Sequence, residues 1–572
     1  MQNLYLFAII KNVVYIKEVH HMLSSFTSQL KSEFKGYNKA KFTKDLMAGI
    51  TVAAVALPLA LAFGVSSGAD AAAGLITAII AGFVMSLLAG GYYQISGPTG
   101  AMAAILTSLV IKYGINGVFV ATFLAGVLLF AAGVLHLGRL TSFIPAPVIT
   151  GFTSGIAVII ALGQIDNFFG TVSEGASAVE KLGSYISLGF KPDFLSVGIG
   201  AFVVVFMLIF PKKLNAVIPA SLLSIIITTA VCIFADLNIA SVGTIPQTLL
   251  PENSLNLSVL TFSNISHLIM PAFSIAALGM IESLLCGASA GQMTGVRLDS
   301  NHELIAQGIG NMLLPFFGGI PATAAIARTS VAIRSGAQTR LTGIFHSVGL
   351  LVSMFALAPV MSKIPMAALA GVLIVTAWRM NDWKNIRYIF SHKFKGAIIE
   401  FIATMLATII FDLTVAIALG VLIGLIFLVL RLSFIEINYE KVDTAKLDIK
   451  DAELIERYNN AIVAYITGPM IFANTQSIAD IEAHIENADT LFLSMRGVSN
   501  IDISCAQTLR TLIESLRSRG IDVALCGLPA KAYEMMKRTD LDRFIGEENF
   551  YWSVASALIT KRPLPDCRKR IA

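Results

Sequence analysis

Long runs without a charged side chain are the feature that most restricts how this chain can fold. They cover residues 48–69, 71–111, 113–135 and 140–165. A helix needs about 20 apolar residues to cross a membrane, so the run from Ala71 to Ile111 contains at least two spans. Hydrophobic residues make up 56% of the 572 positions and charged residues 13%. The chain is therefore predicted to be a polytopic α-helical membrane protein with an additional soluble part.

Hydropathy predicts about fourteen membrane segments, seven in each half of residues 46–434. The lysines before the first segment, from Lys31 to Lys44, place residues 1–45 on the cytoplasmic side as an N-terminal arm. No Lys or Arg occurs between Lys213 and Arg297, as expected for an external connection. An odd number of segments per half makes the halves inverted repeats. The segments are 48–66, 72–91, 97–111, 115–137, 147–166, 194–210, 214–235, 266–287, 303–318, 322–335, 340–360, 365–378, 396–411 and 414–433.

The third segment of each half is interrupted by Gly and Pro, at residues 97–101 (GPTGA) and 319–323 (GIPAT). From Thr99 to Lys112 there is room for about a dozen helical residues, or about 20 Å, whereas the hydrocarbon core is about 30 Å thick. Each interrupted segment is therefore predicted to be a half-helix that begins near the membrane centre. Two such breaks in matching positions indicate the binding site of a secondary transporter. The alternative is that Gly and Pro only kink two spanning helices.

In inverted repeats the two half-helices cross antiparallel, so their N-termini meet. The positive ends of the helix dipoles and the unpaired N–H groups then form a site for an anion. Thr99 and Thr323 are the first hydroxyls at the breaks and are candidate donors. Small residues would let an anion approach the backbone, and apolar side chains would line the remaining wall of the site. For the apolar residues, ordinary packing in the protein core is the alternative explanation. The candidates of these two kinds are Gly100, Ala101, Ala324, Leu59 and Phe63.

Residues 435–572 differ from the preceding part in their dense charge. Short apolar strands alternate with amphipathic helices in this region, which predicts a small α/β domain on the cytoplasmic side. The expected strands are 461–467, 490–495 and 522–526, and the expected helices are 476–486, 503–517 and 530–538. The region contains neither GxxxxGK[ST] nor GxGxxG, so these loops do not indicate a nucleotide cofactor.

Two groups of residues resemble a known family. Residues 56–64 (ALPLALAFG) and 94–100 (QISGPTG) are similar to the SulP family of anion transporters. Residues 468–473 (GPMIFA), 495–498 (MRGV) and 502–504 (DIS) resemble a STAS domain. The resemblance extends from about residue 40 to about residue 560. It implies a seven-plus-seven inverted repeat with core and gate domains, an anion site between the half-helices, a homodimer and elevator-type movement of the core.

Glu282 lies within an apolar segment, where a carboxylate is costly and indicates function. Its expected role is ion coupling, as a proton carrier or a sodium ligand; the alternative is a structural pair with Arg297. In sodium-coupled bicarbonate members of the family an Asp here is followed four residues later by Thr, but this chain has Cys286. A thiol is a poor ligand for hard cations. The resemblance also implies a positively charged side chain at the position of Arg328, where it would attract the anion. The alternative is that Arg328 forms a salt bridge that only neutralises Glu282.

Other ionisable residues carry weaker predictions. Ser504 matches the position that is phosphorylated in soluble STAS relatives, so it is a candidate phosphosite, with a helix N-cap as the alternative. His346 is expected at the membrane interface. The five cysteines have no metal or disulfide spacing. We predict no catalytic residues, metal, cofactor or nucleic-acid partner.

The sequence thus predicts a secondary active transporter of a small inorganic or carboxylate anion in the bacterial inner membrane. Sulfate, bicarbonate and C4-dicarboxylates remain open as substrates. H⁺ symport is preferred, with Na⁺ symport or anion exchange as alternatives. A nucleobase permease is less favoured because of Arg328 and the STAS tail. From another class, a membrane-held sensor that signals through its STAS domain is the rival hypothesis.

Overall fold

The computed structural model describes residues 24–559 except 25, 140–143, 176–177, 216–217, 252, 257, 259–261, 412, 443–455, 457 and 486–487. Residues 1–23 of the predicted arm and the last residues of the predicted C-terminal domain, 560–572, lie outside this part. The chain forms two compact units, Met1–Val421 and Leu422–Ala572. Each unit contains its own hydrophobic core.

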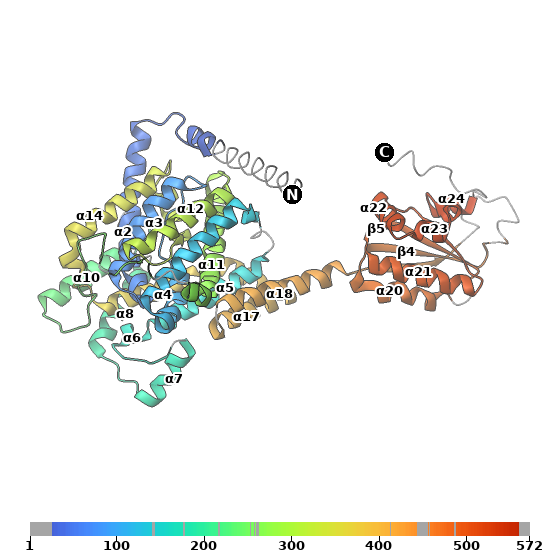
Figure 1. Ribbon diagram of the computed structural model, residues 1–572. Coiled ribbons are helices and arrows are strands. Elements are labelled where there is room, and N and C mark those ends of the chain that lie inside the picture. Colours follow the sequence, from blue (N-terminus) through green and yellow to red (C-terminus); the bar gives the residue numbers. More distant parts are fainter. Residues whose placement is uncertain are drawn as a thin grey trace. The chain divides into compact units, whose positions relative to one another are not determined.

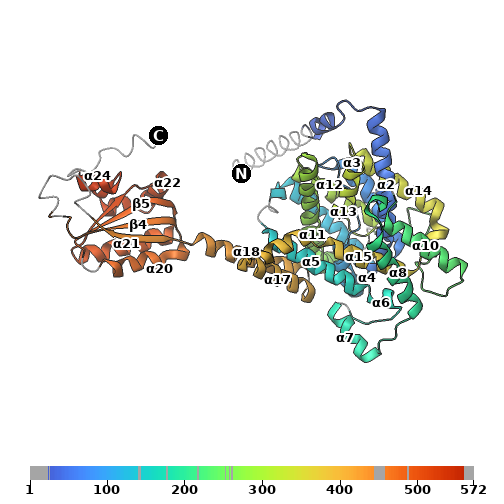
Figure 2. The same ribbon diagram turned by 180° about the vertical axis from the view of Figure 1, so that it is seen from behind.

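The first unit is helical, and each predicted membrane segment coincides with a helix or part of one (Figures 1 and 2). In its described residues, six helices are long and apolar enough to cross a membrane; the total of fourteen spans stays a prediction. The helices that contain the predicted segments of the first half are α2 (Lys39–Ser66), α3 (Ala71–Leu88), α4 (Gly100–Val134), α5 (Ala146–Gly163), α8 (Phe194–Ile209) and α10 (Ala220–Phe234). Those of the second half are α11 (Phe262–Thr294), α12 (Ser300–Leu313), α13 (Ile326–Arg334), α14 (Leu341–Met361), α15 (Met366–Met380), α17 (Lys395–Ile410) and α18 (Leu413–Leu432), and the boundary between the two units falls within α18.

Helix α4 contains both the third and the fourth predicted segments. They are separated at Gly114, whose φ of 68° and ψ of 175° are not helical. Such a backbone conformation is accessible to Gly because it lacks a Cβ atom. The first half-helix therefore runs from Gly100 to about this kink, close to the predicted length. The second half-helix, α13, begins at Ile326 rather than at the predicted residue 322, since residues 323–324 are extended.

The two breaks pair with each other. Strand β1 (Ser96–Gly97) lies antiparallel to β2 (Thr323–Ala324), with Ser96 opposite Ala324 and Gly97 opposite Thr323. Helices α4 and α13 begin shortly after these strands. The predicted antiparallel crossing of the two broken segments is therefore confirmed.

The helices of the first unit form two packing groups. In one group α4 packs against α11 and α12, and α14 packs against α2 and α3. In the other group α5 packs against α17, and α8 packs against α15. These groups correspond to the predicted core and gate. The breaks lie in the core group, and α5 and α15 contact it from the gate.

The described part of the N-terminal arm is attached to the beginning of α14. Glu33 accepts hydrogen bonds from the Arg340 backbone N–H (2.6 Å) and Nε (2.8 Å). Asp45 accepts from the hydroxyls of Thr339 (2.6 Å) and Thr342 (2.9 Å). Burial raises the pKa of Glu33 although the Arg340 guanidinium lies beside it. Helix α2 begins at Lys39, so the predicted boundary at residue 45 falls inside a helix.

The second unit contains a five-stranded sheet in the order β3-β4-β5-β6-β7 (Figure 1). Strand β3 is antiparallel to β4, and the other neighbours are parallel. Leu491 and Leu493 of β5 pack in one core with α21, whereas Phe492 between them packs on the other face with α24. The strands are β3 (Glu436–Lys441), β4 (Ala461–Met470), β5 (Thr490–Ile501), β6 (Asp522–Cys526) and β7 (Phe550–Tyr551); the main helices are α20 (Thr475–Ala479), α21 (Ile503–Ser518), α22 (Ala530–Arg538), α23 (Leu541–Ile545) and α24 (Val554–Ile559). The predicted α/β domain is confirmed, and β3, β7, α23 and α24 were not predicted.

Candidate functional site

Buried side chains hold the non-helical backbone of the first break. The backbone N–H of Ile95 donates to the Thr329 hydroxyl (3.0 Å), and its carbonyl accepts from the Ala325 N–H (2.9 Å). Ser96 Oγ accepts from Gln307 Nε2 (2.9 Å). Backbone groups inside a membrane must find partners within the protein. Residues of α12 and α13 thus supply partners for a break that lies far away in the sequence.

The second break is held in the same way by α3 and α12. The Asn311 side chain binds both the N–H and the carbonyl of Ala322, each at 2.9 Å. Thr77 accepts from the Ile320 N–H (2.8 Å) and donates to its carbonyl (3.2 Å). Thr77 and Asn311 are buried. Their hydrogen bonds fix the extended backbone that leads into β2.

Thr99 joins the first half-helix to Glu282. Its hydroxyl caps α4 by accepting from the Met102 N–H (3.4 Å), and it donates to Glu282 Oε2 (2.8 Å). In the described part of the chain Glu282 forms no ion pair, either with Arg297 or with Arg328. The two ion pairs that the sequence left open as structural alternatives for Glu282 are therefore not seen in this structure. Two of the predicted site residues, Thr99 and Glu282, are in direct contact.

Thr323 also contacts α11. Its hydroxyl lies 2.8 Å from Ser283 Oγ and donates to the Gly279 carbonyl (3.3 Å). Ser283 Oγ accepts in turn from the Ala324 N–H (3.3 Å). Both predicted threonine hydroxyls thus bind α11 within one turn of each other. The hydroxyls fasten the breaks to α11, and their role as donors to an anion stays a prediction.

Arg328 supplies the positive charge at the breaks. It is the third residue of α13, and its side chain is 1% exposed. Nη2 donates to the Pro98 carbonyl (3.0 Å), and Nη1 lies over Gly97 without a hydrogen-bond partner. No side chain caps α13. An unpartnered guanidinium N–H beside an uncapped helix N-terminus is well suited to an anion.

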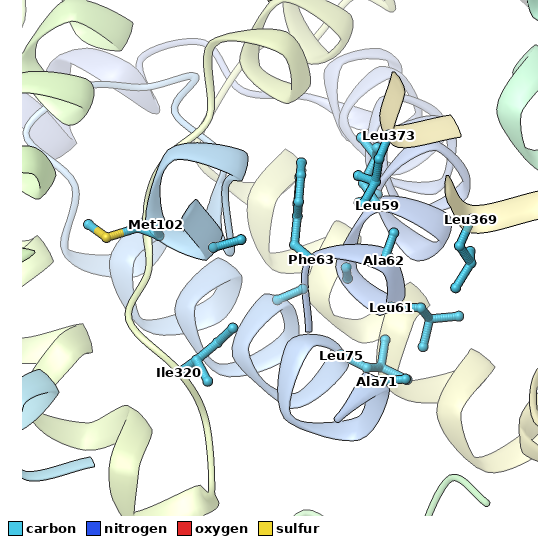
Figure 3. Packing of buried hydrophobic residues seen from close by; sticks show 14 of the residues in the cluster. Leu59, Leu61, Ala62, Phe63, Ala71, Leu75, Met102, Ile320, Leu369 and Leu373 are labelled. Carbon is cyan, nitrogen blue, oxygen red and sulfur yellow. The ribbon is translucent and has the colours of Figure 1, made fainter. Parts of the chain in front are cut away.

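The apolar wall of the site comes from α2. Phe63 lies between Leu59 and the first turn of α4, which carries Met102 (Figure 3). A Cβ atom added to Gly100 would come 3.2 Å from the Phe63 ring and would collide with Ile160 of α5. Leu59 and Phe63 are buried in the main core cluster, as are Ala101 and the neighbouring residues of α2. Gly100 is therefore the position where the gate helix α5 touches the beginning of the first half-helix.

Sequence reasoning missed a second buried carboxylate. Glu303 of α12 is fully buried; Oε2 accepts from the Gly90 N–H (3.0 Å), and Oε1 accepts from Gln307 Nε2 (2.8 Å). Gln307 also binds Ser96 of the first break. The sequence did contain a signal for this site. Glu303 stands at the start of an apolar segment, and Gln307 and Asn311 follow four and eight residues later, so the three polar side chains share one face of a helix.

Two expectations about other ionisable residues are wrong. His346 is fully buried in α14, not at an interface, since small residues of α3 such as Gly82 leave room for its ring. Asp502, not Ser504, caps α21, because its side chain accepts from the Cys505 N–H (2.9 Å). Ser504 is exposed in the first turn of this helix. Its role as a phosphosite stays a prediction.

The comparison with known families agrees with this architecture. The sulfate permease family matches residues 42–407, and the STAS domain matches residues 454–557. The first match covers more than half of the chain. The chain therefore belongs to the sulfate permease family of anion transporters, and it is a multi-pass membrane protein with a C-terminal STAS domain.

Individual relatives cover nearly the whole chain. YvdB of Bacillus subtilis, provisionally named a sulfate transporter, is 34% identical over 91% of this chain and 97% of its own. The bicarbonate transporter BicA of Synechocystis is 30% identical over 90% of this chain and 93% of its own. These curated relatives are named as transporters, not as enzymes.

Solved structures show the same fold. The transmembrane domain of a cyanobacterial BicA superposes with a TM-score of 0.62 at 31% identity and covers 67% of this chain and 98% of that chain. The murine anion transporter Slc26a9 in its inward-facing state gives a TM-score of 0.79 at 19% identity and covers 92% of each chain. The latter similarity concerns the fold alone.

Thr99→Val tests the link between the first half-helix and Glu282. We expect gradient-driven uptake to fall about tenfold, because a hydrogen bond to a charged group contributes about 1.5–3 kcal/mol. Thr99→Ser keeps the hydroxyl and is expected to retain most of the uptake. The measurement is the initial uptake rate in proteoliposomes with equal amounts of folded protein. An equal fall in the uptake rate of both variants would show that the loss of uptake does not come from the loss of the hydroxyl.

Gly97→Ala tests the close approach of Arg328 to the first break. The added methyl group would collide with Arg328 Nη1, so the guanidinium must move. We expect anion affinity to fall about tenfold or more, as for the loss of one charge-assisted hydrogen bond. Gly198→Ala in α8 is the matched control, since nothing lies within 4 Å of its added methyl group. Unchanged affinity in Gly97→Ala would place the anion away from this guanidinium.

Proposed function

We propose that this chain is a secondary active transporter that carries a small oxyanion, sulfate or bicarbonate, across the bacterial inner membrane together with H⁺. The observation that carries the proposal is the paired strands β1 and β2, which bring two helix N-termini and the buried Arg328 guanidinium together. Arg328 Nη1 has no partner there. An anion would complete its hydrogen bonds and offset its buried charge.

The two substrates come from the relatives, which are named for sulfate or bicarbonate transport. Both are small oxyanions that can accept hydrogen bonds from Arg328 and from the backbone N–H groups at the start of α13. Thr323 and Ala324 shape the adjoining strand, and Gly100 and Ala101 shape the opposite helix end. A C4-dicarboxylate remains a less favoured substrate, because the small residues at the breaks are surrounded by buried side chains.

Glu282 is the proposed coupling residue. An isolated ionised carboxylate in an apolar environment is costly, so binding a proton or a cation relieves that cost. The thiol of the neighbouring Cys286 donates a hydrogen bond to the Thr329 hydroxyl oxygen (3.2 Å). A thiol in this place is a poor partner for Na⁺. These contacts favour H⁺ over Na⁺ as the coupling cation, and anion exchange remains the other alternative.

The two packing groups support an elevator-type movement. The site lies on the core group, and the gate touches it through α5 and α15. We propose that the core slides along the gate while the breaks keep their hydrogen bonds. We also propose that the chain is a homodimer whose STAS domain lies in the cytoplasm, as the lysine pattern of the sequence predicts.

Uptake by purified full-length chain in proteoliposomes tests the proposal. Labelled sulfate, bicarbonate and a C4-dicarboxylate are offered with an inward H⁺ gradient, with an inward Na⁺ gradient and with neither. We expect one of the two inorganic anions to accumulate only with the H⁺ gradient. Accumulation only with Na⁺ would support the alternative coupling. No uptake of any anion would contradict transport and leave the rival hypothesis of a membrane-held sensor.

A further inference from the structure

A cavity of about 710 Å³ lies between the core and gate groups. Its walls come from the end of α2, from residues 104–113 of α4, from the last turns of α5 and α17, from residues 270–274 of α11, and from α7 (Ala178–Leu188) and α18. The lysine pattern of the sequence places these parts of the helices on the external side of the membrane. The cavity is therefore an external feature, separate from the breaks themselves.

The lining residues of the cavity are mostly apolar, and they include two lysines but no carboxylate. Lys112 stands at the end of the first half-helix, and Lys181 belongs to α7 (Ala178–Leu188). Neither forms an ion pair in the described part of the chain. A concave surface of one charge sign concentrates ions of the opposite sign and raises their association rate.

Three of the hydroxyls in the cavity wall already donate to backbone carbonyls of the protein. Thr107 donates to the Ser66 carbonyl (2.8 Å), Ser108 donates to the Ile105 carbonyl (2.9 Å), and Thr408 donates to the Thr404 carbonyl (2.7 Å). The two ammonium groups are the charged donors that the lining residues offer to an anion in this cavity.

Ile160 connects the cavity to the site at the breaks. It lines the cavity, and its Cδ1 lies against Gly100, the first residue of α4. Ile160 belongs to the gate helix and Gly100 belongs to the core, so movement between the groups would separate them. Ile160 thus lies both in the wall of the cavity and against the beginning of the half-helix.

We propose that this cavity is an outer capture site, where Lys112 and Lys181 collect the transported oxyanion before it passes Ile160. This inference rests on the proposed function as an anion transporter. The site holds the anion weakly, because both ammonium groups remain hydrated. Its effect is to increase the rate at which external anion reaches the breaks.

The test uses cells that express the full-length chain, so that added anion meets only the external face. The probe is labelled sulfate, with bicarbonate as the second probe. For Lys112→Gln combined with Lys181→Gln we expect KM to rise about fivefold or more, with the maximal rate unchanged. The difference should shrink at high ionic strength, because salt screens the two charges.

Lys191→Gln is the matched control, since Lys191 lies on the same predicted external side but does not line the cavity. An unchanged KM in the double variant would overturn the capture site. So would an equal rise in the control, which would indicate general surface charge, or a fall in the maximal rate alone, which would indicate a structural role. If the parent chain takes up neither anion, the proposed function fails as well. If the parent takes up an anion and the double variant has the same KM as the parent, the capture site alone fails.

Discussion

Glu282→Gln is expected to abolish accumulation of the anion while exchange across the membrane continues. Gln resembles the protonated carboxyl group in shape and can still bind the Thr99 hydroxyl, 2.8 Å away in the parent. It cannot take up or release a proton. The transporter would therefore bind its anion and move it, but a pH gradient would no longer drive concentration against the anion gradient.

The deciding measurement compares counterflow with gradient-driven uptake in the same vesicles. Glu400→Gln is the matched control, because Glu400 is also a buried carboxyl group of the membrane unit but lies on α17 in the gate group. We expect this control to retain gradient-driven uptake. If Glu282→Gln still concentrates the anion, Glu282 does not carry the coupled proton. If substrate binding depends on Na⁺ in the parent and this dependence vanishes in Glu282→Gln, the coupling ion is Na⁺.

Arg328→Ala is expected to lower anion affinity about 100-fold. The guanidinium offers more than one charge-assisted hydrogen bond, and each contributes about 1.5–3 kcal/mol. The parent side chain also donates to the Pro98 carbonyl (3.0 Å), so thermal unfolding must be measured beside transport. Arg328→Lys keeps the charge but loses the planar fork, and we expect it to recover only part of the affinity.

Arg334→Ala provides the comparison on the same helix. Arg334 is the last residue of α13 and is exposed, so its loss removes a similar side chain outside the breaks. We expect transport by Arg334→Ala to remain close to that of the parent. Equal losses in Arg328→Ala and Arg334→Ala, or unfolding of both, would make Arg328 a structural residue.

The helices and the breaks could be predicted because they follow from local patterns. Long uncharged runs indicate spans, and Gly and Pro at residues 97–101 and 319–323 indicate where two of them stop. The antiparallel meeting of the breaks followed from an odd number of segments in each half. The short apolar run at residues 490–495 likewise predicted a strand, and in the structure Leu491 and Phe492 of this strand face opposite cores.

The partners within the site could not be predicted, because they join residues far apart in the sequence. The hydrogen bond between Thr99 and Glu282 joins two residues 183 positions apart, and it appeared only in the structure. Asn311 and Thr77 looked like ordinary polar residues in apolar helices, yet they hold the second break. Sequence spacing gives the direction of a side chain on its own helix, but not the helix that it meets.

The position of the bound anion tests the central claim most directly. A crystal of the full-length chain with selenate, an anomalously scattering analogue of sulfate, can be measured at the selenium absorption edge, after showing that selenate competes with uptake. We predict an anomalous peak within hydrogen-bonding distance of Arg328 Nη1, between the beginnings of α4 and α13. The account would be contradicted if selenate inhibits uptake but its anomalous peak in the membrane unit lies away from both breaks.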